Sequence, residues 1–100
     1  MNTHPMKLVT IIGEALARQS LKKLLTEVGA HGYTLFPVEG NGSQGHRTAD
    51  IQEFANIQVE VIVPPAVADT LLARLEIEFF PKFAMVAYDT DIRVLRREKF

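Results

Sequence analysis

The chain has no cysteine and no tryptophan, and its formal net charge at pH 7 is only −1. The absence of cysteine excludes disulfides, thiolate zinc sites and cysteine nucleophiles. The near-zero net charge disfavours a nucleic-acid-binding protein that works by bulk electrostatic attraction. No apolar run approaches the roughly 18 residues of a membrane span, and the first residues lack the basic and apolar regions of a signal peptide. We therefore expect a cytoplasmic protein that neither binds nucleic acid nor inserts into a membrane.

Glycine is also scarce, but three of the six glycines, at positions 40, 42 and 45, lie close together. They belong to a stretch, residues 40–50, that has no large apolar side chain and carries Arg47, the only arginine between positions 19 and 73. Such a stretch cannot build a hydrophobic core, but its backbone N–H groups can surround an anion. It also spells G-x-G-x-x-G, the pattern of a dinucleotide-binding turn.

The dinucleotide-binding interpretation fails on its context, because that pattern must join a strand directly to a helix whose N-terminus meets the pyrophosphate. A strand from Tyr33 to Val38 does precede the glycines, and Glu60 lies at about the right distance for a ribose contact. Residues 46–56 offer at most two helical turns, however, and too little chain follows for the rest of a Rossmann sheet. We favour an anion- or phosphate-binding loop, with a connection that binds no ligand as the alternative.

Hydrophobic periodicity predicts the elements on either side of this loop. Residues 8–12 are β-branched and apolar, as in a buried strand, and residues 14–28 show helical spacing up to a stop at Gly29. Residues 33–38 form a second strand, in which Pro37 indicates an edge or a strand end. After the loop we expect a strand at 57–63, a helix that starts at Pro64-Pro65, a strand at 83–88 and a short strand at 92–95.

This order predicts an α+β protein with the ferredoxin-like βαββαβ fold, an antiparallel sheet and a short extra C-terminal strand. We expect one domain over residues 1–100, with residues 1–6 flexible and residues 40–54 forming the long loop. Both helices would cover one face of the sheet. The other face also carries alternating apolar residues, and other copies of the same sheet are its simplest cover. A homo-oligomer is therefore expected, in keeping with a hydrophobic content of 47%.

Three stretches resemble the PII-like signalling proteins, which are small trimeric ferredoxin-like sensors of nucleotides. Residues 27–35 are similar to the E-x-G-x-x-G-x-T pattern at the end of that family's first helix. Residues 38–44 are similar to the start of its long T-loop. Residues 59–64 and 68–70 are similar to its third strand and second helix. The resemblance implies a homotrimer in which residues 40–54 are the T-loop.

Departures from the common PII pattern indicate a particular branch. Residues 79–84 contain no glycine where standard members have a Gly-Asp-Gly-Lys phosphate loop, and Ser43 replaces an arginine of the T-loop. The modifiable T-loop tyrosine and the 2-oxoglutarate lysine, whose place falls near Asn56, are missing. The chain is more similar to the bicarbonate-transporter regulators and carboxysome-associated members. These members share a Gly-Tyr-Thr start of the second strand, a Gly-x-Gly-Ser loop with a later arginine, and a Phe-Phe pair before the fourth strand. The same features occur here at residues 32–34, at residues 40–43 with Arg47, and at Phe79-Phe80.

The resemblance implies a non-catalytic sensor without a covalently bound cofactor, which binds the adenine nucleotides ADP, AMP or ATP between subunits, with ADP and AMP favoured. Bicarbonate is a second expected ligand, and ordering of the T-loop would signal energy or inorganic-carbon status to a bicarbonate transporter or a carboxysome component. The implied nucleotide-binding residues are Thr34, Gly40, Asn41, Gly42, Ser43, Arg47, Glu60, Ile62, Phe83, Ala84 and Arg96. The implied bicarbonate site consists of Gly42, Ser43, Gln44, Gly45 and Arg47.

Energetics favour a T-loop that becomes ordered only when several contacts form together. Fixing eleven backbone residues costs on the order of 10 kcal/mol, whereas one arginine contact contributes roughly 1.5–3 kcal/mol. We therefore expect the empty loop to be disordered. The alternative for Arg47 and Arg96 is that they are solvated surface charges. A metal site at His46, Asp50 and Glu53 is a further alternative, but their spacing alone is not specific for metal binding.

Two other function classes remain open. The first is a small ferredoxin-like enzyme that acts on an acyl phosphate or a nucleotide phosphate; the acyl-phosphate hydrolases of this size use a backbone anion site with an arginine. Ser20 and Ser43 have no evident His–Asp partners, so the sequence offers no serine-based catalytic constellation. The third class is a trimeric scaffold that binds no ligand.

Overall fold

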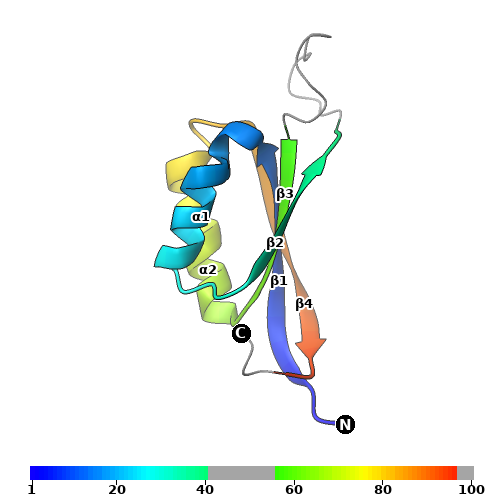
Figure 1. Cartoon of the computed structure of the whole chain (residues 1–100). Helices are drawn as coiled ribbons and strands as arrows, with labels where there is room; N and C mark the ends of the chain where they lie inside the picture. Colours follow the sequence, from blue (N-terminus) through cyan, green and yellow to red (C-terminus); the bar gives the residue numbers. More distant parts are fainter. Residues whose placement is uncertain (41–55, 97–100) are drawn as a thin grey trace.

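The computed structural model describes residues 1–40 and 56–96, and the elements and contacts below are those of these residues. A long central strand, two helices and three further strands make up this part of the chain (Figure 1). The elements in chain order are β1 (His4–Glu14), η1 (Ala15–Ala17), α1 (Arg18–Glu27), β2 (Tyr33–Val38), β3 (Asn56–Val63), α2 (Pro65–Arg74), η3 (Leu75–Phe79) and β4 (Met85–Val94).

The four strands form one antiparallel sheet in the order β2-β3-β1-β4, so that β1 is paired on both sides. Both helices lie against the same face of this sheet (Figure 1). The arrangement confirms the predicted ferredoxin-like fold. It also places β2, which contains Pro37, at an edge, where a residue without an N–H donor is tolerated.

Because side chains alternate along each strand, the sheet has two distinct faces. We call the face covered by α1 and α2 the helix face and the other the open face (Figure 1). On the helix face Val9 and Ile11 of β1 are completely buried. They pack in one cluster with leucines of α1 and α2, of which Leu21 and Leu71 are also fully buried. Full burial of each such side chain contributes roughly 1.5–3 kcal/mol. This cluster fixes the helices on the sheet and leaves the even-numbered residues of β1 on the open face.

The first helix begins later than the periodicity suggested. Glu14 is the last residue of β1 rather than the first of a helix, and a short 3-10 turn, η1, separates β1 from α1. At its other end β1 starts at His4, so it includes part of the segment 1–6 for which we expected flexibility. Local spacing could not reveal this length, because the strand is extended by pairing with two distant neighbours.

The expected short fifth strand is not a separate element, because β4 runs without a break from Met85 to Val94. The sequence around Asp89 and Asp91 resembles a turn. Lys7 of β1 lies on the same face and pairs with both carboxylates, at 2.7 Å from Asp91 and 4.0 Å from Asp89. The two charges can therefore remain within a strand.

Gly29 ends α1 as predicted. It has a positive φ of 84°, the left-handed conformation that follows many helices. The Ala30 N–H donates to the Leu25 carbonyl at 2.9 Å, and the Gly29 N–H donates to the Thr26 carbonyl at 3.2 Å. This pair of bonds is a Schellman motif, and it turns the chain into the connection that leads to β2.

The second helix begins at Pro65 with Pro64 as its N-cap, as the sequence predicted. It ends in one wide turn, η3, in which the Phe80 N–H donates to the carbonyl of Leu75, five residues earlier, at 3.0 Å. The wide turn keeps both Leu75 and Phe79 buried in the core. Among the described residues, no helix has the length and apolar character needed to cross a membrane.

Gly29 and Gly32 provide a matched test of the helix end, because a Cβ added at either position would meet nothing within 4 Å. Only Gly29 has a positive φ. We expect Gly29→Ala to lower the free energy of unfolding by about 1 kcal/mol through backbone strain, and Gly32→Ala to have little effect. Urea denaturation of both variants measures the difference, and equal effects would contradict this role of Gly29.

Candidate functional site

One end of the sheet brings together the segments that the sequence singled out. Val38 at the end of β2 pairs with Asn56 at the start of β3, and Asn56 pairs with Glu14 at the end of β1. Gly13 pairs with Met85 at the start of β4. The residues on both sides of segment 41–55, and the connection from η3 to β4, therefore lie at the same end of the molecule.

Gly40 lies at this end, two residues after β2. Its φ is not positive, and a Cβ added to it would reach only the Asn56 side-chain nitrogen, at 4.0 Å. Nothing in the described part of the chain therefore requires glycine at this position.

Glu14 ties the connection before β4 to the end of β1. The Ala84 N–H donates a hydrogen bond of 2.7 Å to Oε2 of Glu14, across 70 positions of sequence. Next to it, a Cβ on Gly13 would lie 3.2 Å from the Ala84 carbonyl oxygen and 3.0 Å from the Met85 side chain. Glycine thus permits the two backbones to approach, and Glu14 fixes the position of Ala84.

Three of the predicted residues share the open face. Thr34 of β2 lies directly opposite Glu60 of β3, and Ile62 follows Glu60 on the same face. Thr34 is exposed, whereas Glu60 and Ile62 are half-buried. Glu60 accepts a hydrogen bond of 3.1 Å from the side-chain amide of Gln58.

The structure separates two other predicted residues from this group. The Phe83 side chain packs on the helix side of the sheet, with its ring centroid 5.9 Å from that of Phe79. Arg96 follows the end of β4, where Val94 pairs with His4, whereas Gly40 lies beside the opposite ends of the strands. At about 3.3 Å per residue, the length of β1 separates these two ends by roughly 30 Å. One chain therefore cannot bring Arg96 and Gly40 to one ligand.

The remaining predicted residues lie outside the described part of the chain. They comprise most of the proposed phosphate and bicarbonate contacts: Asn41, Gly42, Ser43, Gln44, Gly45 and Arg47. The metal alternative at His46, Asp50 and Glu53 also falls there, as does the expectation that the T-loop is disordered when empty.

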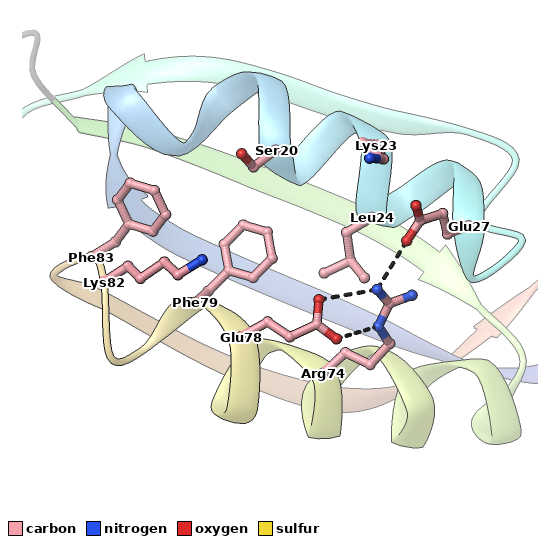
Figure 2. Close-up of a pocket in the computed structure, with 9 residues that line it drawn as sticks. All are labelled: Ser20, Lys23, Leu24, Glu27, Arg74, Glu78, Phe79, Lys82 and Phe83. Carbon is pink, nitrogen blue, oxygen red and sulfur yellow. Dashed lines mark hydrogen bonds and ion pairs between the residues drawn. The ribbon is translucent and has the colours of Figure 1, made fainter.

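A cavity of about 380 Å³ lies on the helix side, between α1 and the end of α2 with η3 (Figure 2). Among the predicted nucleotide-binding residues that the structure describes, only Phe83 lines it. The other lining residues are Ser20, Lys23, Leu24, Glu27, Arg74, Glu78, Phe79 and Lys82.

Arg74 crosses this cavity and links its two sides (Figure 2). Its guanidinium donates to Glu78 on the same side, at 2.7 and 3.0 Å, and to Glu27 of α1 at 2.9 Å. The hydrogen bond from Arg74 holds the pKa of Glu78 below its ordinary value. The bonds of Arg74 to Glu27 and Glu78 link α1 to α2 and η3, and both carboxylates already bind the guanidinium.

Neither the Arg74 group nor the Glu14–Ala84 bond was predicted from the sequence. The four-residue spacing of Arg74 and Glu78 is a local signal that could have indicated their pairing. No local signal could have connected Glu14 with Ala84, because only the register of β1 with β4 brings them together.

Comparison with known proteins agrees with this geometry. The family model of the nitrogen regulatory protein P-II matches residues 6–99. A structure from Thermus thermophilus, described as that of a PII-like signalling protein, is 43% identical with a TM-score of 0.84, and the match covers 100% of this chain and 99% of that one. The chain therefore belongs to the P-II family.

Structures of CPII, a PII-like protein from Thiomonas intermedia K12, are also similar. CPII bound to ADP and bicarbonate is 30% identical with a TM-score of 0.86, and the match covers 99% of this chain and 97% of that chain. CPII bound to ADP, AMP and acetate is likewise 30% identical with a TM-score of 0.86, with coverage of 100% and 98%.

The Arg74 group predicts a specific pH dependence of stability. Since the pKa of Glu78 is lowered in the folded state, its contribution is complete above its ordinary pKa. That contribution is lost as the pH falls through the lowered value. We expect Glu78→Gln to lower Tm slightly at pH 7, by about 1–3 °C for an exposed pair, and the deficit to vanish in acid.

Glu76→Gln is the matched control, because Glu76 is exposed in the same turn and has no ion pair within residues 1–40 and 56–96. Differential scanning calorimetry from pH 3 to pH 8 measures both variants. A Glu78→Gln deficit that persists unchanged at low pH would contradict the ionic origin of the effect.

Proposed function

We propose that the protein is a non-catalytic homotrimeric sensor that binds ADP or AMP between subunits, with bicarbonate as a second ligand. The observation that carries this proposal is the similarity, over 99% of the chain, to CPII bound to ADP and bicarbonate. Segment 79–84 has no glycine, in contrast to the Gly-Asp-Gly-Lys loop of standard PII proteins. This difference favours the branch of bicarbonate-transporter regulators and carboxysome-associated members.

Two features of the chain support a site between subunits. First, Gly40 and Arg96 lie at opposite ends of the sheet, so a ligand that contacts both must receive them from different copies. Second, the open face carries large apolar side chains that are accessible to solvent: Val86 is 56% exposed and Tyr88 is 50% exposed. Packing of three such faces would bury them and bring the end of β4 in one copy near the loop base of another.

In this arrangement the backbone at Gly40, Gly42 and Ser43 approaches the phosphates. Within the described part of the chain, no contact of the fold requires glycine at position 40. A close approach of the backbone to a phosphate would explain why glycine is present there. Thr34, Glu60 and Ile62 form a wall on the open face. Arg47 of the loop and Arg96 of a second copy would supply positive charge, and backbone N–H groups of residues 42–45 with Arg47 would hold bicarbonate.

Ligand occupancy would then change the shape of the T-loop that a partner contacts. We propose that the loop reports energy or inorganic-carbon status in the cytoplasm to a protein of bicarbonate uptake or carbon fixation, such as a transporter or a carboxysome component. The chemistry of the two ligands defines this signal, because the nucleotide reflects energy status and bicarbonate reflects the supply of inorganic carbon.

Titration calorimetry with AMP, ADP, ATP and cyclic AMP, each with and without bicarbonate, tests the ligand. We expect ADP and AMP to bind more tightly than ATP. Arg47→Ala should weaken ADP binding by about tenfold to a hundredfold, because it removes charge-assisted hydrogen bonds. Gln44→Ala is the control in the same loop and should have less effect. Absence of binding by all four nucleotides would refute the proposal, and release of phosphate beyond stoichiometry would identify an enzyme instead.

Sedimentation equilibrium tests the assembly. We expect a mass three times that of the 11.2 kDa chain. Val86→Asp should shift the protein toward monomers, because it places a charge in the apolar interface. Gln19→Asp, an exposed change on α1, is the matched control and should leave the trimer intact. A monomeric wild-type protein at micromolar concentration would contradict the proposed site.

A further inference from the structure

The carboxylate of Glu14 is a fixed negative charge at the end of the sheet where Gly40 lies. Its Oε2 accepts the Ala84 N–H at 2.7 Å, and the residue is half-buried. Within residues 1–40 and 56–96 no lysine, arginine or histidine forms an ion pair with it. The carboxylate is therefore held in place by a backbone donor, and no cation of this part of the chain neutralises it.

The same contact occupies the Ala84 N–H, so this donor is not free for an anionic ligand. A Cβ at position 13 would lie 3.2 Å from the Ala84 carbonyl oxygen, so glycine there allows β1 and the Ala84 backbone to lie this close together. A phosphate oxygen at the Ala84 N–H would have to displace a carboxylate that already has a short hydrogen bond. Phosphates placed nearby would also be repelled, and the repulsion rises with the charge of the ligand.

We infer that Glu14 is a specificity-determining residue of the nucleotide site and selects against ligands with more phosphate charge. This inference rests on the proposed function, in which Ala84 and Gly40 border the nucleotide phosphates. AMP, with the fewest charges, is least affected by Glu14, and ATP is most affected. Glu14 thereby sets the preference of the site for nucleoside mono- and diphosphates over triphosphates.

The test compares the wild-type trimer with Glu14→Gln by titration calorimetry with AMP, ADP and ATP at low salt. Glutamine retains an oxygen that can accept the Ala84 N–H, so the substitution removes mainly the charge. We expect affinity to increase by about twofold for each phosphate charge within about 10 Å of the carboxylate. The gain should therefore be largest for ATP, and it should shrink in 1 M salt, where the Debye length is about 3 Å.

Asp69→Asn is the matched control for net charge. Asp69 is exposed on α2, in the helix layer, whereas Thr34, Glu60 and Ile62 lie on the opposite face of the sheet (Figure 1). This variant should leave all three affinities unchanged. Glu14→Ala, which removes both the charge and the hydrogen bond, should show the same ranking of gains if charge decides the selectivity.

The outcomes separate this inference from the proposed function. If the wild-type protein binds ADP but Glu14→Gln leaves the nucleotide affinities equal or lower, the role of Glu14 is overturned and the nucleotide site stands. If the gains are equal for AMP and ATP, selection by charge is overturned. If the wild-type protein binds no nucleotide, the proposed function fails, and the role of Glu14 fails with it.

Discussion

The antiparallel pairing of β1 with both β3 and β4 sets the geometry of the whole sheet. It fixes which residues of three strands share a face, because side chains alternate strictly along each strand. Val9 and Ile11 then meet the helices and are fully buried, while Thr10 and its cross-strand neighbours Glu60 and Tyr88 lie on the open face. A slip of one residue would exchange these two sets.

The same pairing determines what the ends of the sheet can do. At one end it places Glu14 against Ala84 and Asn56 beside Gly40, so the two connections that border the proposed phosphate site meet there. It sends the end of β4, with Arg96, to the other end. The separation is about the length of β1, which is why the proposed function needs more than one copy of the chain.

Much of the fold could be predicted from the sequence, because the signals are local. The alternation of residues 57–63, the two prolines at 64 and 65, and Gly29 each indicated an element or a boundary that the structure confirms. The predicted ends of the strands were wrong where contacts with residues far away in the sequence determine how far a strand extends. Lys7 allows β4 to continue past Asp89 and Asp91, and two neighbouring strands extend β1 to Glu14.

The candidate site was less predictable than the fold. Resemblance to a family indicated Thr34, Gly40, Glu60 and Ala84, and the structure places these on one face or at one end of the sheet. Family resemblance alone did not indicate Glu14, because its contact with Ala84 depends on this chain's own register. The predicted loop contacts around Arg47 lie outside the described residues and stay predictions.

In the proposed function copies of the chain together form the nucleotide site, and sedimentation velocity followed at the adenine absorbance shows whether nucleotide and trimer move together. The chain has no tryptophan and only two tyrosines, so bound nucleotide dominates the signal. We expect ADP to sediment with the trimer and the assembly-defective Val86→Asp chain to carry none. Sedimentation of ADP with a monomer, or of a trimer without ADP at saturating concentration, would contradict the proposed function.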